Sequence, residues 1–275
     1  MKIIPLAGVI GYPVAHSRSP KLHRHWLKRY GLPGDYVPLH VHEDDLGQVL
    51  KALPRMGFVG ANVTIPHKVA VMEHADQISD RAILIGAANT LIFKEDGRIY
   101  ADNTDGYGFI SSLKQGAPGW VPSDGPAGVF GAGGAARAVI SALLDAGVEE
   151  ILLTNRTRPK AEALRTEFGS RLRVVDWVQA GNMLEDCATV VNTTSLGMTG
   201  QPEFRVPLDG LRRGTVVTDL VYTPLRTRLL READAAGCLT VDGLGMLLHQ
   251  GVPGFERWFG QRPEVDDAAR AAALR

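Results

Sequence analysis

The chain has 275 residues, of which 45% are hydrophobic and 22% are charged, and its 30 basic residues balance its 30 acidic ones. This size and composition predict a soluble globular protein with one large domain or two ordinary ones. The neutral balance argues against nucleic acid or a membrane surface as a partner, because both usually need a clustered basic excess. The sequence contains no run of 18 apolar residues, so no transmembrane helix is expected.

Cysteine and histidine usage favours a cytoplasmic protein without a bound metal. Cys187 and Cys238 lie far apart and are expected to be reduced thiols. The apolar N-terminus lacks a small-residue cleavage site, so it is interpreted as a first strand and not as a signal peptide. The eight histidines, among them His23 and His25, show no ligand spacing for a metal and are expected to be solvated.

Strand-like and helix-like segments alternate along the first part of the chain. Strands are expected at 4–11, 36–41 and 60–65, helices at 20–30, 43–52 and 68–74, and a hairpin around 95–98. The segment 115–128 is rich in Pro and Gly, which predicts a loop that joins two lobes.

After this loop the alternation is more regular. Strands are expected at 128–130, 151–154, 189–192 and 215–220, and helices at 135–146 and 159–168. Repeated strand–helix units predict a parallel, doubly wound sheet. A closing helix is expected at 244–259, with a break or kink at Gly251, Pro253 and Gly254.

A glycine loop in the second part predicts a dinucleotide site. Gly131-Ala132-Gly133-Gly134-Ala135-Ala136 follows a strand and opens a helix, so it fits the pattern G-x-G-x-x-A. The glycines let the backbone approach a pyrophosphate, which the N–H groups at the start of the helix can bind. At the end of the next strand, Asn155-Arg156-Thr157-Arg158-Pro159-Lys160 has no carboxylate and three cations, which favours NADP over NAD.

Polar groups in the first part predict a substrate site. Ser19 is expected to cap a helix, although with Ser17 it also offers two hydroxyls for a carboxylate. Pro66 is expected to begin a helix with Lys68 in its first turn, where the helix dipole favours the neutral amine and hence proton transfer. Asn62 and Thr64 are expected to share one face of the preceding strand.

Other polar residues allow a purely structural interpretation. Asp105 and Asp80 are each expected to cap a helix, and Asn89 suits a turn. Gln250 lies on the closing helix.

Nine segments in one order resemble the shikimate dehydrogenase family over essentially the whole chain: HSRSP, GANVTIPHK, GAANTL, DNTDG, GAGGAARA, NRT, NTTSLGM, DLVYTPLRTRLL and DGLGMLLHQ. The resemblance implies an α/β fold with a cleft between two domains. One is an N-terminal substrate domain with a mixed sheet, residues 1–104 plus 243–275. The other is a Rossmann NADP domain with a doubly wound parallel sheet, residues 105–242.

The resemblance also implies a role for each motif. Lys68 and Asp105 form the acid–base pair. The substrate is bound by Ser17, Ser19, Asn62, Thr64, Asn89, Tyr222 and Gln250. The cofactor is bound by Gly131, Ala132, Gly133, Gly134, Ala135, Asn155, Arg156, Thr157, Lys160, Leu220, Gly243 and, more weakly implied, Asp80. Lys160 departs from the family, which often has Arg there, so its paired contact with the 2′-phosphate is lost.

The implied reaction is the NADPH-dependent reduction of 3-dehydroshikimate to shikimate in aromatic amino-acid biosynthesis, by a monomer or homodimer acting on a small molecule. Three alternatives stay open: a quinate/shikimate dehydrogenase that uses NAD, a methylene-tetrahydrofolate dehydrogenase, and a non-catalytic NADP-binding module. An acidic residue in place of Asn155-Arg156 would favour NAD.

Overall fold

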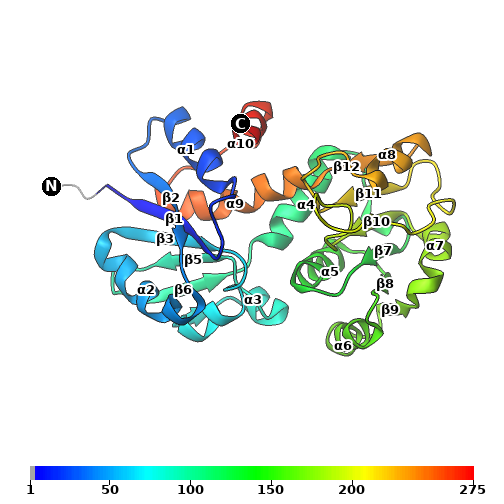
Figure 1. The fold of residues 1–275 in the computed structure, drawn as a ribbon, viewed down its shortest axis with the longest axis horizontal. Helices are drawn as coiled ribbons and strands as arrows, with labels where there is room; N and C mark the ends of the chain where they lie inside the picture. The colour runs from blue at the N-terminus through cyan, green and yellow to red at the C-terminus, as the bar shows by residue number, and fades with distance from the viewer. Residues whose placement is uncertain (1–3) are drawn as a thin grey trace. The chain divides into compact units, whose positions relative to one another are not determined.

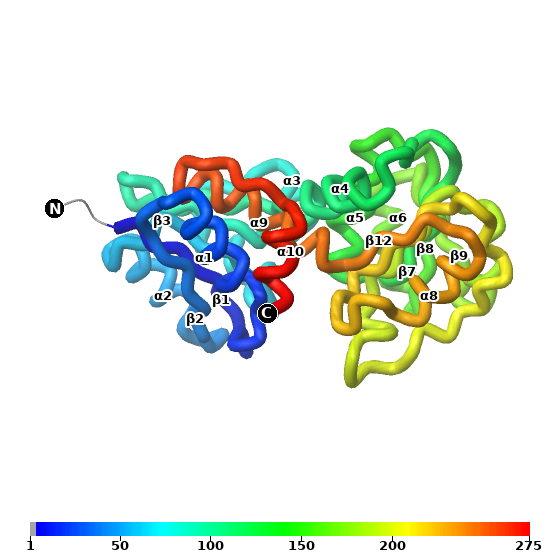
Figure 2. The backbone as a smooth tube through the Cα atoms, turned by 90° about the horizontal axis from the view of Figure 1, so that it is seen from above, coloured from blue at the N-terminus to red at the C-terminus, as the bar shows by residue number. Residues whose placement is uncertain are grey.

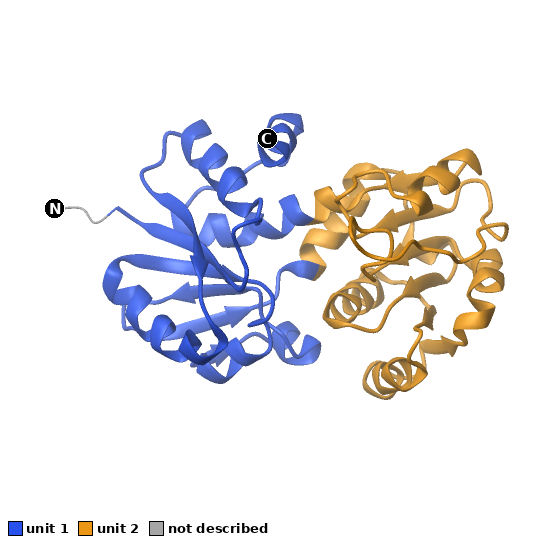
Figure 3. Ribbon diagram, viewed as in Figure 1, with its two compact units in different colours: residues 1–105, 247–275 blue, residues 106–246 orange. Residues whose placement is uncertain are grey.

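The chain forms two compact units. The structure is a computed structural model that describes residues 4–275, so residues 1–3 of the apolar N-terminus lie outside it. Figure 1 and Figure 2 trace the chain from blue at the N-terminus to red at the C-terminus. Unit 1 combines the residues up to Asp105 with Leu247–Arg275, and unit 2 is Gly106–Met246 (Figure 3).

Unit 1 is built on a 6-stranded mixed sheet with the order β2-β1-β3-β5-β6-β4. β1 is parallel to β2 and β3, β5 is antiparallel to β3 and β6, and β4 is parallel to β6. The predicted hairpin is confirmed as β5 and β6. The strands are β1 (Leu6–Gly11), β2 (Asp35–His40), β3 (Phe58–Val63), β4 (Gln77–Ile78), β5 (Thr90–Phe93) and β6 (Ile99–Asp102).

Helices cover both faces of this sheet. Successive strand residues point to opposite sides, so each strand contributes side chains to both faces. Ile10 packs with Leu50 of α2, whereas its neighbour Val9 packs with Trp258 of α9. In Figure 1, α1 and α10 lie on the side opposite α2. The helices are α1 (Ser19–Arg29), α2 (Leu46–Ala52), α3 (Asp80–Ile85), α10 (Asp267–Leu274), the part of α9 (Gly243–Phe259) from Leu247 on, and the 3-10 helices η1 (Glu43–Asp45), η2 (Leu53–Met56) and η3 (Ala70–His74).

Unit 2 is built on a 6-stranded sheet with the order β12-β11-β10-β7-β8-β9, in which all neighbours are parallel. The predicted doubly wound parallel sheet is therefore confirmed, although β9 and β12 were not predicted. The strand order reverses beside β7, which is where ligands bind in such sheets. The strands are β7 (Ala127–Phe130), β8 (Ile151–Thr154), β9 (Leu172–Val175), β10 (Thr189–Asn192), β11 (Val216–Asp219) and β12 (Leu239–Val241).

Two cores lie on the two faces of the unit 2 sheet. Val129 packs with residues of α4, α5 and α6, whereas its neighbour Phe130 packs with residues of α7 and α8. Within residues 4–275, no helix is long and apolar enough to span a membrane. The helices of this unit are α4 (Asp105–Gly116), α5 (Gly134–Ala146), α6 (Arg158–Phe168), α7 (Ala180–Met183), α8 (Arg228–Ala235) and the 3-10 helices η4 (Pro122–Asp124), η5 (Trp177–Gln179) and η6 (Leu184–Asp186).

The Pro- and Gly-rich segment 115–128 does not join the two units, so that prediction is wrong. The segment lies within unit 2, and the chain first leaves unit 1 after Asp105. Ala117 and Trp120 are buried in the core of unit 2, and the Trp120 indole donates to Thr189 Oγ1 at 2.9 Å. Burial of these side chains anchors the segment to the core of unit 2, although its composition is typical of turns.

A break or kink was expected at Gly251, Pro253 and Gly254, but helix α9 continues through all three, so the break is wrong. A Cβ atom on Gly251 would lie 3.0 Å from His23 Nε2, and one on Gly254 would lie 2.7 Å from the Trp258 ring. These glycines therefore do not end the helix. Their lack of a side chain leaves room for the His23 and Trp258 rings to pack against it.

The expectation of solvated histidines is wrong for His23 and His67, which are both buried. The His23 ring stacks on Tyr36 with ring centroids 4.0 Å apart, and Trp26 and Phe255 pack around it. Neither ring nitrogen of His23 has a hydrogen-bond partner among residues 4–275. Burial in this aromatic cluster disfavours the charged ring and lowers the pKa of His23 to about 3.

Candidate active site

Lys68 lies on the loop after strand β3, in unit 1. The expected helix does not begin there, because residues 65–69 form turns and η3 follows as a short 3-10 helix. Ile65 and Val69 are 74% and 64% exposed while Val71 is buried, so the apolar residues of this segment do not form one continuous buried helix face. The predicted action of a helix dipole on Lys68 is therefore wrong. The Lys68 carbonyl instead accepts from Ala88 N at 2.8 Å.

Asp105 begins helix α4 directly after strand β6. It is the first helical residue and not the cap, so the cap interpretation is wrong. The side chain of Asn103 accepts the Asp105 backbone N–H at 3.0 Å and donates to the Ala87 carbonyl at 2.9 Å. Asn103 thus anchors the backbone of Asp105 at the start of α4.

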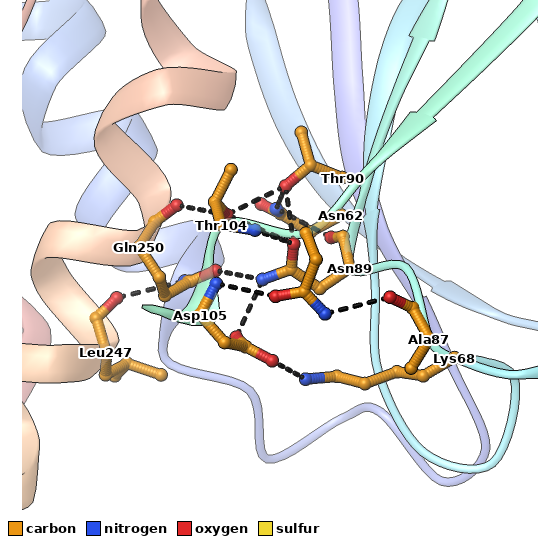
Figure 4. A network of polar contacts seen from close by, with 10 residues as sticks. Asn62, Lys68, Ala87, Asn89, Thr90, Thr104, Asp105, Leu247 and Gln250 are labelled. Carbon is orange, nitrogen blue, oxygen red and sulfur yellow. Dashed lines mark hydrogen bonds and ion pairs between the residues drawn. The ribbon is translucent and has the colours of Figure 1, made fainter. Parts of the chain in front are cut away.

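Lys68 and Asp105 form a close ion pair (Figure 4). Lys68 Nζ donates to Asp105 Oδ2 at 2.6 Å, and the side chains are 32% and 12% exposed. Asn89 Nδ2 donates to the other carboxylate oxygen at 2.7 Å. Charge-assisted hydrogen bonds in a partly buried site are strong, so this arrangement fixes the ammonium group. The two predicted catalytic residues are thus brought together.

Asn89 is the centre of the polar network around this pair. It is 2% exposed, and its Oδ1 accepts from Thr104 N at 2.8 Å and from Thr90 Oγ1 at 3.0 Å. Its Nδ2 also donates to Gln250 Oε1 at 3.2 Å. An asparagine held from several sides keeps its N–H groups directed at Asp105.

Gln250 reaches this network from helix α9. Its Nε2 donates to the Leu247 carbonyl at 3.0 Å, and its own carbonyl accepts from Thr104 Oγ1 at 2.9 Å. The helix therefore orients a predicted substrate residue beside a predicted catalytic one, although Gln250 and Asp105 lie far apart in the sequence.

Ser17 and Ser19 lie at the N-terminus of α1. Arg18 is the cap residue and Ser19 is the first helical residue, so the predicted cap is wrong; Ser17 Oγ accepts from Ser19 N at 3.3 Å. Burial raises the pKa of Tyr36 well above its usual value, and a hydrogen bond with Ser19 opposes this. The Tyr36 hydroxyl donates to Asn62 Oδ1 at 2.7 Å.

Asn62 connects this end of the site to the central network. Its Nδ2 donates to the Asn89 carbonyl at 3.1 Å and to Thr90 Oγ1 at 3.2 Å. Thr64 lies one residue beyond the end of β3, so the two do not share a strand face as predicted. A Cβ atom on Gly11 would lie 2.5 Å from Thr64 Cγ2, so the glycine makes room for this side chain.

The glycine loop of unit 2 joins β7 to α5, as predicted. Gly131 has a φ of +105°, and a Cβ atom there would lie 2.7 Å from Thr193 Oγ1, so both conformation and space require glycine. Gly133 is the cap residue of α5 but offers no side-chain acceptor. Cβ atoms on Gly133 and Gly134 would meet open space. The first N–H groups of α5 are therefore accessible to an anion.

The cationic turn after β8 contains three exposed cations with different partners. Arg158 pairs with Glu162 at 2.8 Å and with Asp176. Arg156 and Lys160 form no ion pair within the part of the chain that the structure describes. Two cations are thus available for an anionic ligand, and the third is neutralised by its neighbours.

Asn155 and Thr157 shape the same turn. Asn155 Nδ2 donates to the Thr157 carbonyl at 2.8 Å. Thr157 is the cap residue of α6, yet its side chain forms no capping bond. Pro159 has no N–H, and Lys160 N donates to the Thr157 carbonyl at 3.1 Å, so an anion at this turn would depend mainly on the exposed cationic side chains.

Leu220 and Gly243 are in contact at the carboxyl end of the unit 2 sheet. A Cβ atom on Gly243 would lie 2.3 Å from the Leu220 carbonyl oxygen, so only glycine fits. Tyr222 follows in the same loop and is half-buried. It belongs to unit 2, whereas the other predicted substrate residues belong to unit 1.

A buried carboxylate at this edge was not predicted. Asp219, which is fully buried, accepts from Asn192 Nδ2 at 2.9 Å, Thr227 Oγ1 at 2.7 Å and Val221 N at 3.0 Å. Burial raises the pKa of Asp219 to about 6, although these hydrogen bonds oppose the shift. Asn192 and Asp219 begin the NTTSLGM and DLVYTPLRTRLL segments, and the signal that could have identified them was a polar residue at the end of each strand.

Asp80 does not cap α3, contrary to the prediction. Ser79 is the cap residue, and its hydroxyl accepts from Ala82 N at 3.2 Å. Asp80 is the first helical residue, is exposed, and belongs to unit 1. Asn103, Thr90 and Thr104 also belong to the network but were not predicted. Their signal was their place beside Asn89 and Asp105 in the segments GAANTL and DNTDG.

Known families and proteins match this chain along most of its length. Three family models match: the shikimate dehydrogenase substrate binding domain at residues 9–91, shikimate/quinate 5-dehydrogenase at 123–198, and the shikimate 5′-dehydrogenase C-terminal domain at 243–273. A protein of Cereibacter sphaeroides named shikimate dehydrogenase (NADP(+)) is 70% identical over 271 residues, which cover 98% of this chain and 97% of the relative.

Solved structures agree along nearly the whole chain. The shikimate 5-dehydrogenase of Thermus thermophilus, in complex with NADP(H) and shikimate, is 39% identical with a TM-score of 0.88, covering 98% of this chain and 99% of that one. A quinate dehydrogenase of Corynebacterium glutamicum, in complex with NAD, is 30% identical with a TM-score of 0.89, covering 98% of both chains.

Proposed function

The chain belongs to the shikimate dehydrogenase family, and we propose that it catalyses the reversible NADPH-dependent reduction of 3-dehydroshikimate to shikimate, in aromatic amino-acid biosynthesis. It is an NADP-dependent oxidoreductase. The single observation that carries the chemistry is the Lys68–Asp105 pair, at 2.6 Å, inside a network of predicted substrate residues.

Lys68 is the proposed proton donor. A ketone that gains a hydride becomes an alkoxide, which needs a proton and a nearby positive charge. The Lys68 ammonium can supply both, and it takes the proton back when shikimate is oxidised. Asp105 holds this ammonium through one oxygen, while Asn89 occupies the other.

The remaining residues of unit 1 are proposed to orient the substrate. Ser17 and Ser19 are proposed to bind its carboxylate at the N-terminus of α1, where the helix dipole favours an anion. Asn89 and Gln250 are proposed to bind its hydroxyl groups beside Asp105. Thr64, Asn62 and Tyr222 complete the proposed substrate set. Unit 1 is accordingly the proposed substrate domain.

Unit 2 is the proposed NADP domain, and its residues fit that cofactor. NADPH supplies the hydride when it is bound. The open N-terminus of α5, from Gly131 to Ala135, would hold the pyrophosphate. Arg156, Thr157 and Lys160, with Asn155 shaping the turn, would hold the 2′-phosphate. Leu220 and Gly243 would lie near the nicotinamide, and Asp80 is a weaker proposed contact.

The proposed enzyme acts in the cytoplasm, as a monomer or homodimer, on a small molecule and not on nucleic acid or a membrane. Its neutral charge balance supports the proposed lack of nucleic-acid and membrane partners. Light scattering behind size exclusion measures the mass directly, and a stable mass larger than a dimer would contradict the proposed state.

The test of the proposed function is an absorbance assay at the NADPH band. The purified chain is incubated with shikimate or quinate, and with NADP or NAD. We expect turnover with shikimate and NADP, and a higher kcat/KM for NADP than for NAD. A preference for NAD would instead favour a quinate/shikimate dehydrogenase. NADP binding without turnover of shikimate would favour a non-catalytic module and refute the proposal.

A further inference from the structure

A second buried carboxylate lies three residues before Asp105, at the end of strand β6. Asp102 is 1% exposed, and nothing above gives it a role. Arg81 Nε donates to its Oδ1 at 2.6 Å, and a second guanidinium nitrogen of Arg81 donates to Oδ2. Ser79 Oγ donates to Oδ1 at 2.7 Å. Asp102 is thus held by a paired fork and a hydroxyl, both from the start of α3.

Asp102 stays ionised in this position. Burial by itself would raise the pKa of its carboxyl group, but the hydrogen bonds from Arg81 and Ser79 outweigh burial and lower it. The Arg81 side chain is 52% exposed, while that of Asp102 is 2% exposed. The pair therefore joins a buried anion to a cation at the surface, in a planar geometry that lysine cannot reproduce.

Two of the partners of Asp105, Asn103 and Asn89, are each hydrogen-bonded to Asp102. Asp102 Oδ1 accepts from Asn103 N at 2.8 Å, and Asn103 in turn accepts the backbone N–H of Asp105. The Asp102 carbonyl accepts from Asn89 N at 3.0 Å, and Asn89 in turn donates to the Asp105 carboxylate. Two separate hydrogen-bonded paths, one through Asn103 and one through Asn89, therefore connect Asp105 to Asp102.

We propose that the Arg81–Asp102 pair is a positioning device that fixes Asp105 against Lys68. Neither Arg81 nor Asp102 touches the reacting groups, so neither is a catalytic residue. The inference rests on the proposed reaction, in which Asp105 must hold the Lys68 ammonium. A small displacement of such a group, on the order of 1 Å, can reduce turnover a hundredfold.

The first test compares Arg81→Met with Arg24→Met. Arg24 forms a paired ion bridge with Asp35 in the same unit, at 2.7 and 3.2 Å, on an exposed surface. We expect kcat to fall roughly tenfold or more in Arg81→Met, with an unchanged Kd for NADP, and to be unchanged in Arg24→Met. Equal kcat values in the wild type and a folded Arg81→Met protein would overturn the proposal.

The second test asks whether Arg81 acts through Asp105. In an Asp105→Asn background, Arg81→Met should reduce kcat much less than it does in the wild type, because the group that it positions is already lost. A loss of the same size in both backgrounds would show that Arg81 acts elsewhere and would overturn the inference.

A third measurement covers the case in which Arg81→Met does not fold. Arg81→Lys keeps the charge and loses the fork, so we expect a folded protein with reduced kcat. Low, non-denaturing guanidinium added to Arg81→Ala should restore part of the lost kcat, while added ammonium should not. Full activity of Arg81→Lys would refute the need for the fork. A wild type without any shikimate turnover would refute the proposed function itself, which separates the two failures.

Discussion

His23 predicts a specific dependence of stability on pH. Its ring is fully buried against Tyr36 and Trp26, and its nitrogens have no hydrogen-bond partner among residues 4–275. Burial lowers its pKa from 6.5 to about 3. In the unfolded chain the ring takes up a proton below pH 6.5, whereas in the folded chain it stays neutral down to about pH 3. Acid therefore favours the unfolded state across this window.

The size of the effect follows from proton linkage. Each pH unit between the two pKa values removes about 1.4 kcal/mol from the free energy of unfolding. Between pH 7.5 and pH 5.0 the contribution of His23 is therefore a loss of about 2 kcal/mol. His249, whose pKa burial lowers to about 4, adds a loss of the same sign. Asp219, whose pKa burial raises to about 6, opposes both between pH 3.8 and pH 6.

The assay isolates His23 by difference. The free energy of unfolding of unit 1 is measured by urea denaturation and by hydrogen exchange in β1 and β3, from pH 7.5 to pH 5.0. His23→Leu has a similar volume and no titrating group, so we expect its loss on acidification to be about 2 kcal/mol smaller than that of the wild type. The contributions of His249 and Asp219 are present in both proteins and cancel.

The matched control is Leu22→Val, on the same helix and equally buried. It should lower stability by about 1 kcal/mol at every pH and leave the pH dependence unchanged. If His23→Leu keeps the pH dependence of the wild type to within about 0.5 kcal/mol, the ring is protonated or hydrated in the folded state and the reasoning fails.

Three further predictions concern the site. Lys68→Ala should lower kcat by about a hundred- to ten-thousandfold in steady-state kinetics, and a loss below about tenfold would exclude a general-acid role. Arg156→Ala should raise the KM for NADP by about tenfold and leave the KM for NAD unchanged. Arg158→Met is the control and should change neither KM, because Arg158 is already paired with carboxylates. Equal effects of the two substitutions would contradict the assignment of the 2′-phosphate site. Gly131→Ala should lower the free energy of unfolding by about 1–3 kcal/mol, because the φ of Gly131 is +105°. Gly133→Ala should leave the free energy of unfolding unchanged and raise the KM for NADP, because a Cβ atom there would meet open space. The reverse pattern in thermal melts would contradict the loop geometry.

The Rossmann half of the fold could be predicted because its signals are local. In unit 2, β7 and β8 are apolar runs, and α5 and α6 begin near a Gly or Pro, so period and punctuation predict them. The short strands β9 and β12 each contain a polar residue and were not predicted. β8 and β10 have the bounds that the sequence predicts. The cofactor side of the site follows as well, because the glycine loop and the cationic turn are both contiguous in sequence.

The substrate side depends on contacts that local patterns do not encode. Nothing in the spacing of Gln250 predicts that it meets Asn89, because α9 returns from the far end of the chain. The burial of His23 depends on Gly251, whose lack of a side chain lets the ring approach α9. A histidine among polar neighbours in sequence therefore becomes the centre of an aromatic cluster only in three dimensions.

The failed prediction about Lys68 bears on how the proton is controlled. The sequence placed this amine at a helix N-terminus, where the dipole would favour its neutral form, but the structure places it on a turn against a carboxylate. Both oxygens of Asp105 already accept hydrogen bonds, one from Lys68 and one from Asn89. We therefore infer that Asp105 holds the Lys68 nitrogen in place through the whole reaction, since the neutral amine left after proton transfer can still donate a hydrogen bond to the same oxygen.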